Sequence, residues 1–215
     1  VWRPIVAAGL EHVRDENDAG VAYSAIRQND RDPRHATLFA LLDRHIRENQ
    51  MLRDISGIVL RTRTPQLYPF EIFMHRAISR EKPDLDSNAY YHPDVPFPGI
   101  KAFLYFNDID SGNAAFRYVP GSHRLTFARL RFEYLKSIRV ARDKKNRKDP
   151  RLSSTFEGRQ WHCLSRGEEI EFQVYGVSQS GKACSLLIFN VMGFHRRGDF
   201  SGDRPRELAA TGYRR

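Results

Sequence analysis

The hydrophobic pattern of this chain consists mainly of short apolar and aromatic runs separated by turn residues. Runs of this kind predict β-strands when they are short and rich in aromatic and β-branched side chains. A DSGN turn between two of the runs predicts a hairpin. The strand candidates are residues 70–78, 89–94, 101–109, 114–119, 169–179, 183–194 and 207–213.

Two segments have a helical period instead. Between Ala36 and Leu52, apolar positions near helical spacing alternate with Arg and Glu, which predicts an amphipathic helix packed against a sheet. Residues 125–140 predict a second helix. The pattern as a whole predicts a mainly β fold with flanking helices, and many short strands favour a jelly roll or barrel over a βαβ sheet.

Length and composition narrow the class of protein. A chain of 215 residues with 40% hydrophobic residues is long enough for one substantial core, so we expect a single domain. Cys163 and Cys184 lack the spacing of a zinc site or a disulfide framework, which favours reduced thiols. Charged residues interrupt the first twenty positions, and no apolar run is long enough to cross a bilayer. We therefore expect a cytoplasmic protein without a membrane span.

The net charge of +9 is concentrated in one segment. Residues 124–151 contain eleven Lys or Arg and three Asp or Glu, a local excess of eight positive charges. Such a block is most often a solvated or disordered segment. The other interpretation is a surface that attracts a phosphate-bearing or otherwise anionic partner.

The candidate chemistry begins with His92 and Asp94. In an extended backbone, side chains two residues apart point to the same face, so both could bind one metal ion. The spacing alone is a weak signal. A facial site of two histidines and one carboxylate needs another histidine from elsewhere, and leaves positions open for a cosubstrate and dioxygen. His195 is the candidate, because it follows an apolar run that would deliver it to the rim of a barrel.

An arginine lies at a suitable position to complete such a site. A keto-acid cosubstrate has a second carboxylate, which a guanidinium neutralises through a two-pronged hydrogen-bonded pair. Arg206 or Arg204 could supply this group. We expect the two to point the same way from one strand, and we favour Arg206.

Three blocks of sequence resemble the phytanoyl-CoA dioxygenase family in the order HPD, NDIDSGNAAFRYVPGSHR and FHRRGDFSGDRPRE. The matches cover roughly residues 91–124 and 186–213. The positions that match the family pattern are His92, Asp94, Asp108, Asn113, Pro120 to Arg124, His195 and Arg206.

The resemblance implies a double-stranded β-helix, a cupin-like jelly roll. It also implies Fe(II) held by His92, Asp94 and His195, with 2-oxoglutarate and O2 as cosubstrates and Arg206 on the distal carboxylate. One departure is Arg197, where the family often has a small hydroxyl residue that helps to bind the keto acid. The remaining candidates for substrate or pocket residues are Tyr90, Phe103 and Tyr105, whose default role in so aromatic a chain is core packing, and Arg76, which could be a substrate-side cation.

The expected organisation is one oxygenase domain over residues 1–215. Residues 1–75 form a helical part with the first strands, and residues 76–124 form the half of the barrel that carries His92 and Asp94. Residues 125–165 form a basic helical or loop insert, and residues 166–215 form the half with His195 and Arg206.

We therefore predict an Fe(II)- and 2-oxoglutarate-dependent dioxygenase that hydroxylates an unactivated carbon of a small-molecule substrate, with release of succinate and CO2. The basic insert hints at an anionic substrate. One alternative is a degenerate β-helix module that binds a polyanion without turnover. Another is a nucleic-acid demethylase, which is disfavoured because the insert has no cluster of aromatic residues for base stacking. The sequence does not predict the substrate or the oligomeric state.

Overall fold

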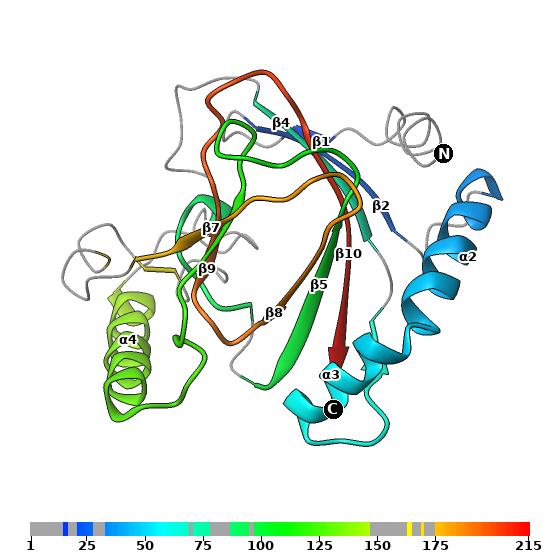
Figure 1. The fold of residues 1–215 in the computed structure, drawn as a ribbon. Helices are drawn as coiled ribbons and strands as arrows, with labels where there is room; N and C mark the ends of the chain where they lie inside the picture. Colours follow the sequence, from blue (N-terminus) through cyan, green and yellow to red (C-terminus); the bar gives the residue numbers. More distant parts are fainter. Residues whose placement is uncertain are drawn as a thin grey trace.

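The computed structural model describes residues 15–16, 21–27, 33–68, 71–77, 87–94, 97–146, 163–164, 169 and 175–215. Two antiparallel sheets form its centre, with α2 and α3 on the outside of the larger sheet and α4 beside the smaller one (Figure 1). No helix within these ranges is both long enough and apolar enough to span a membrane.

The larger sheet has seven strands among the described residues, in the order β1-β2-β4-β10-β5-β8, with β3 paired to β10. The C-terminal strand β10 is central, so the last residues of the chain join segments from its beginning and its middle. The strands are β1 (Asp15–Glu16), β2 (Val21–Arg27), β3 (Gln66–Leu67), β4 (Glu71–Ala77), β5 (Gly99–Tyr105), β8 (Leu186–Asn190) and β10 (Arg206–Arg214).

The smaller sheet has the order β7-β6-β9. It consists of β7 (Val177–Gln179), β6 (Phe116–Tyr118) and β9 (His195–Arg197), all paired antiparallel. An isolated bridge between His92 and His195 adds one more chain segment beside β9.

Two separate cores follow from the two faces of the larger sheet. Because side chains alternate along a strand, Phe103 of β5 and Leu208 of β10 face the smaller sheet, where they pack with Phe116. Ala102 and Ala209 face the opposite way, toward the helices. The fold is therefore a jelly roll, the double-stranded β-helix that the sequence predicts.

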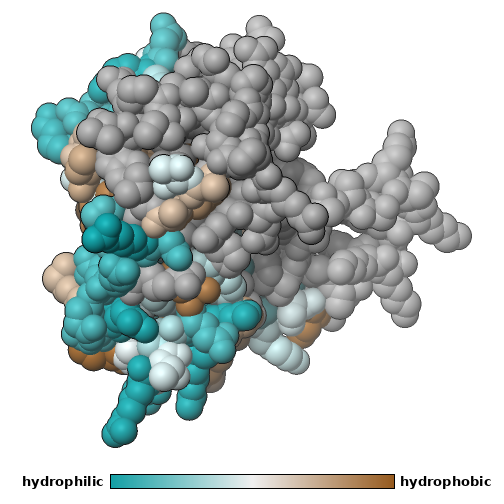
Figure 2. Space-filling model, turned by 90° about the vertical axis from the view of Figure 1, so that its right-hand side faces the viewer, coloured by the Kyte–Doolittle hydropathy of each residue, from teal (hydrophilic) through white to brown (hydrophobic). Residues whose placement is uncertain are grey.

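The helices α2 (Pro33–Arg47) and α3 (Gln50–Leu60) cover the outer face. Their buried residues Phe39, Leu42, Ile46, Leu52 and Leu60 belong to the same core cluster as Ala209. Figure 2 shows the side of the molecule that carries these helices, where the described surface is largely hydrophilic with isolated hydrophobic residues. The pair thus covers the sheet with its buried apolar residues, while its outer side is mostly polar apart from the exposed Met51, Ile58 and Val59 of α3.

Several predicted elements differ from the structure in their bounds. The single helix expected between Ala36 and Leu52 is two helices, because Asn49 caps α3 by accepting a hydrogen bond from the Leu52 amide at 3.0 Å. The strand expected over residues 183–194 is shorter, since a turn follows β8 before His195. Of the strand expected at 169–179, β7 is present, and residues 170–174 lie outside the described ranges.

The predicted helix after residue 125 is α4 (Phe127–Asn146), which extends into the basic block. The strand expected over residues 89–94 was wrong: a short 3-10 helix, η2 (Ser87–Ala89), ends there, and His92 forms only an isolated bridge. The strands expected near residues 70–78, 101–109, 114–119 and 207–213 are confirmed as β4, β5, β6 and β10, with bounds that differ by a few residues.

Candidate metal centre

The main chains of His92 and His195 lie side by side at the β9 edge of the smaller sheet. The amide of His92 donates to the carbonyl of His195 at 2.9 Å, and the amide of His195 donates back at 3.0 Å. The amide of Asp94 donates to the carbonyl of Val191 at 3.0 Å. Backbone pairing therefore brings the two predicted halves of the site together.

The side chains of His92, Asp94 and His195 converge. One ligand atom from each of them lies within 4.8 Å of the others, and they form the only such cluster found among the described residues. The Nε2 atom of His195 is 3.5 Å from Oδ1 of Asp94. Two imidazoles and one carboxylate are a donor set that suits Fe(II) and leaves coordination positions open.

Both imidazoles are oriented by a carbonyl oxygen. Nδ1 of His92 is 2.7 Å from the carbonyl oxygen of Tyr90, and Nδ1 of His195 is 2.9 Å from that of Gly193. A carbonyl only accepts hydrogen bonds, so each Nδ1 carries a proton, and Nε2 is the ring nitrogen left to bind a metal ion. This tautomer is the one needed to bind a metal ion through Nε2.

The protonation states also suit a metal. The pKa of His92 is lowered from 6.5 to about 4, mainly by burial and in part by the neighbouring His195. Burial acts to raise the pKa of Asp94, but Lys101 and the two histidines outweigh it, and the net shift is strongly downward. At neutral pH, His92 is neutral and Asp94 is ionised.

Arg206 lies on the inner face of the larger sheet, at the start of β10. Its side chain is almost fully buried, and its Nε atom has no hydrogen-bond partner within the part of the chain that the structure describes. Its guanidinium carbon is 5.6 Å from the centre of the Phe103 ring. The pKa of Arg206 is lowered to about 10, mainly by burial and in part by Arg197, while Tyr105 acts in the opposite direction. A buried cation with an unused donor is prepared to receive an anion.

Two asparagines fix the main chain around Arg206. Asn107 donates to the carbonyl of Pro205 at 2.6 Å and accepts from the amide of Glu207 at 3.0 Å. Asn113 donates to the same Pro205 carbonyl at 3.2 Å and to the carbonyl of Asp108 at 2.8 Å. The segment that resembles the family motif therefore serves here to hold the residues on both sides of Arg206.

The PGSHR segment and α4 hold the turn that leads into His195. The hydroxyl of Ser122 accepts from the amide of Phe194 at 2.8 Å and donates to the carbonyl of Val119 at 2.7 Å. Arg129 of α4 donates to the carbonyls of Ser122 and Met192, at 2.6 and 3.2 Å. Its guanidinium also lies 4.0 Å from the centre of the Phe194 ring. The beginning of the basic insert thus supports the turn that precedes the candidate ligand His195.

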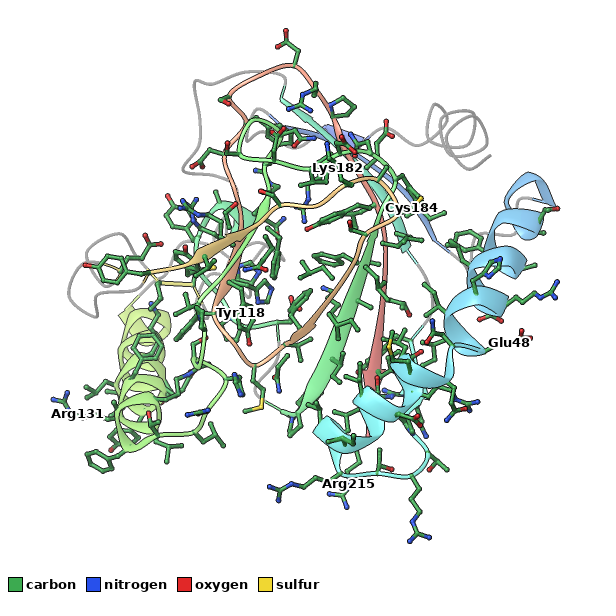
Figure 3. All side chains as sticks on the ribbon, in the orientation of Figure 1. Glu48, Tyr118, Arg131, Lys182, Cys184 and Arg215 are labelled. Carbon is green, nitrogen blue, oxygen red and sulfur yellow. The ribbon has the colours of Figure 1, made fainter. Side chains whose placement is uncertain are left out.

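The aromatic candidates Phe103 and Tyr105 lie in the core between the sheets. Phe103 makes an edge-to-face contact with Phe116, and the hydroxyl of Tyr105 donates to the carbonyl of Gln179 at 3.1 Å. The ring of Phe116 lies 5.2 Å from that of His195, between centroids. Figure 3 shows Tyr118, from the same strand as Phe116, pointing into the space between the sheets. These rings line the interior around the candidate metal centre.

The other candidates have different positions. Arg204 precedes β10 and forms an exposed ion pair with Asp110 at 2.6 Å, so the expectation that it shares a strand and a direction with Arg206 was wrong. Arg197 is buried on β9, 5.0 Å from the centre of the Phe200 ring. Tyr90 orients His92 through its carbonyl. Arg76 belongs to β4, and its side chain lies outside the described residues.

Lys101 is a residue of this site that the sequence analysis missed. Its Nζ atom lies 3.2 Å from Oδ2 of Asp94 and 5.9 Å from the centre of the Phe103 ring. The alternation of β5 contains the signal, because Lys101 is on the same face as Phe103 and Tyr105. The ring of Phe103 therefore has two cations near it, the Lys101 ammonium and the Arg206 guanidinium.

No protein-family model matches the chain, and no curated protein matches it. Solved structures with a similar fold include the non-haem alpha-ketoglutarate-dependent epimerase SnoN from nogalamycin biosynthesis, at a TM-score of 0.60 and 16% identity over 99% of this chain and 72% of that one. HygX from Streptomyces hygroscopicus, solved with nickel and 2-oxoglutarate, has a TM-score of 0.56 and 18% identity over 98% and 78%. EvdO2 from Micromonospora carbonacea var. aurantiaca has a TM-score of 0.54 and 12% identity, over 99% of this chain and 79% of that one. The chain shares the double-stranded β-helix fold of these proteins.

Proposed function

We propose that this chain is an Fe(II)- and 2-oxoglutarate-dependent oxygenase that hydroxylates an unactivated carbon of a small molecule. The observation that carries the proposal is the convergence of His92, Asp94 and His195 in a fold that also buries the unpartnered Nε of Arg206. His92, Asp94 and His195 would hold Fe(II), and Arg206 would bind the distal carboxylate of 2-oxoglutarate. When bound, the iron and the keto acid supply dioxygen activation coupled to decarboxylation to succinate and CO2.

The residues of the chain bind and orient in this proposal. Arg206, 5.6 Å from the centre of the Phe103 ring, is the cation available for the distal carboxylate, because Lys101 already pairs with Asp94 at 3.2 Å. Phe116 and Phe189 pack around His195 at ring-centroid distances of 5.2 and 5.1 Å and exclude water from that side. A dry site strengthens the pairing between a guanidinium and a carboxylate.

The solved structures support a small-molecule substrate. SnoN has been solved with Fe3+, alpha-ketoglutarate and nogalamycin RO, and HygX with nickel, 2-oxoglutarate and hygromycin B. Both of these ligands are small molecules rather than macromolecules. The involvement of Arg129 in holding the turn before His195 favours a structural role for the start of the basic insert over nucleic-acid binding.

Epimerisation is a second candidate reaction, because SnoN is an epimerase with this fold. The two reactions differ in the fate of dioxygen. A hydroxylase product carries one oxygen atom from 18O2, whereas an epimerised product has the mass of the substrate. Both reactions use the same ligands and the same cosubstrate.

The proposed function is tested by the release of succinate from 2-oxoglutarate in the presence of Fe(II) and O2, first without substrate and then with pools of small molecules. We expect slow uncoupled release that a true substrate accelerates, and we expect His195→Ala to abolish both. His45→Ala is a matched control, because His45 is exposed on α2. Equal release from the wild type and His195→Ala would contradict the proposal.

A further inference from the structure

The two oxygens of Asp94 have different neighbours. Oδ1 faces the triad, 3.5 Å from Nε2 of His195, whereas Oδ2 faces the Lys101 ammonium at 3.2 Å. The side chains of Asp94 and Lys101 are 24% and 34% exposed, so the pair is partly shielded from water. Oδ1 is therefore directed toward the candidate metal ligands, while Oδ2 already accepts a hydrogen bond from Lys101.

The fold fixes Lys101 in this position. On β5, Lys101 is the neighbour of Phe189 of β8 on one side and of Gly212 of β10 on the other. Strands on both sides prevent β5 from sliding or turning, so the lysine stays on the inner face. The hydrogen bond from the Asp94 amide to Val191 fixes the other partner.

A carboxylate can bind a metal ion through one oxygen or through both. If Asp94 used both, it would occupy a coordination position that the keto acid or dioxygen needs. A partner that donates to a ligating carboxylate restricts its orientation, and the loss of such a partner usually costs 10–100-fold in metal affinity or activity.

We propose that Lys101 is a positioning residue for the metal: it holds Oδ2 of Asp94, so that Asp94 binds the metal through Oδ1 alone. This inference rests on the proposed function, because it assigns Asp94 as a metal ligand. It adds a fourth residue to the site and explains why a lysine lies on the inner face of β5.

The charge of Lys101 and its hydrogen bond act in opposite directions. A cation beside a metal ion repels it, so the loss of charge alone would strengthen metal binding. The loss of orientation would weaken binding and change the coordination of the metal. The direction of the change in affinity therefore separates a positioning role from a purely electrostatic one.

The test is a titration of the full chain with Co(II), without 2-oxoglutarate, following the visible d–d bands. Lys101→Met removes the donor and the charge, Lys101→Gln keeps a donor, and Lys101→Arg keeps both. Lys182→Met is the matched control, because it removes a Lys–Asp pair of 2.9 Å with Asp108 on the exposed surface. Lys182 lies on a loop well away from Tyr118 in Figure 3. Circular dichroism checks that each variant is folded.

We expect Lys101→Met to bind Co(II) about 10-fold or more weakly and with altered d–d bands, as the loss of an outer-shell partner predicts. Lys101→Arg should keep the wild-type bands, and Lys101→Gln should be intermediate. If Lys101→Met misfolds, the folded Lys101→Gln variant decides the outcome alone. Unchanged or tighter binding with wild-type bands in Lys101→Met, or in Lys101→Gln in that case, would overturn the inference but not the proposed function. A wild-type chain that binds no Co(II) would overturn both.

Discussion

The amides of His92 and His195 each donate to the carbonyl of the other residue, at 2.9 and 3.0 Å. Two candidate ligands from opposite parts of the sequence are thus joined by their main chains, independently of any metal. A site built in this way should be largely preformed. Changes that disturb the turn before His195 should then weaken metal binding even when they leave all three ligands in place.

Gly193 provides such a change, because a Cβ atom at this position would collide with the Tyr118 side chain. We expect Gly193→Ala to lower the free energy of unfolding by about 1–3 kcal/mol through overpacking. Metal affinity should fall with it, since Gly193 also orients His195 through its carbonyl. Chemical denaturation and Co(II) titration measure the two effects. Gly202→Ala is the control, because its Cβ would meet only one atom, at 3.9 Å; equal effects of the two changes would contradict the explanation.

Ser122 holds the same turn by accepting the hydrogen bond of the Phe194 amide. Ser122→Ala leaves that partly buried amide without its partner, which costs about 1–3 kcal/mol. We expect lower stability and weaker Co(II) binding. Ser137→Ala removes an exposed hydroxyl that donates to the Tyr134 carbonyl, and it should change neither quantity. A stable Ser122→Ala variant with wild-type affinity would show that the turn does not need this contact.

Arg206 is predicted to lower the stability of the ligand-free fold and to be needed for 2-oxoglutarate binding. Its buried charge destabilises the ligand-free fold, so Arg206→Leu should raise the free energy of unfolding by about 1–3 kcal/mol. The same variant should lose 2-oxoglutarate binding, measured by isothermal titration calorimetry with Co(II) present. Arg204→Leu is the control, because Arg204 pairs with Asp110 on the surface and should not affect binding. Loss of binding in Arg204→Leu alone would reverse the assignment.

The stability of the metal-free protein should fall as the pH falls from 6.5 to 4. The pKa of His92 is about 4 in the folded chain, below the ordinary 6.5, so in this window the unfolded chain binds a proton that the folded chain does not. His92 therefore contributes a slope of at most about 1.4 kcal/mol per pH unit. Urea unfolding at pH 7 and pH 5 should show a smaller loss for His92→Gln than for the wild type or His45→Gln. Equal losses would mean that His92 has the same pKa in the folded and the unfolded chain.

The sequence predicted the fold class because alternation and turn residues determine which faces of short strands are buried. The bounds were less predictable. Asn49 interrupts a continuous helical pattern, since a side chain that caps the next helix also ends the preceding one. The turn between β8 and His195 is as apolar as the strand, because Val191, Met192 and Phe194 are buried there.

The candidate site was predictable where it consists of side chains in a recognisable order, such as His92, Asp94 and His195. The contacts that hold these three residues in place could not be predicted from the sequence, because they depend on tertiary packing. Arg129 belongs to a basic segment that composition assigns to solvent, yet its side chain packs on Phe194. Arg204 and Arg206 are two residues apart, but only Arg206 lies in β10.

The most direct test of the account is an anaerobic titration with Fe(II) and 2-oxoglutarate, monitored through the visible metal-to-ligand charge-transfer band. It requires no substrate. We predict a band in the wild type and in His45→Ala, no band in His92→Ala, and a band in Arg206→Leu only at much higher 2-oxoglutarate concentrations. A folded wild-type protein that gives no band, or a band that survives His92→Ala, would contradict the proposed metal centre.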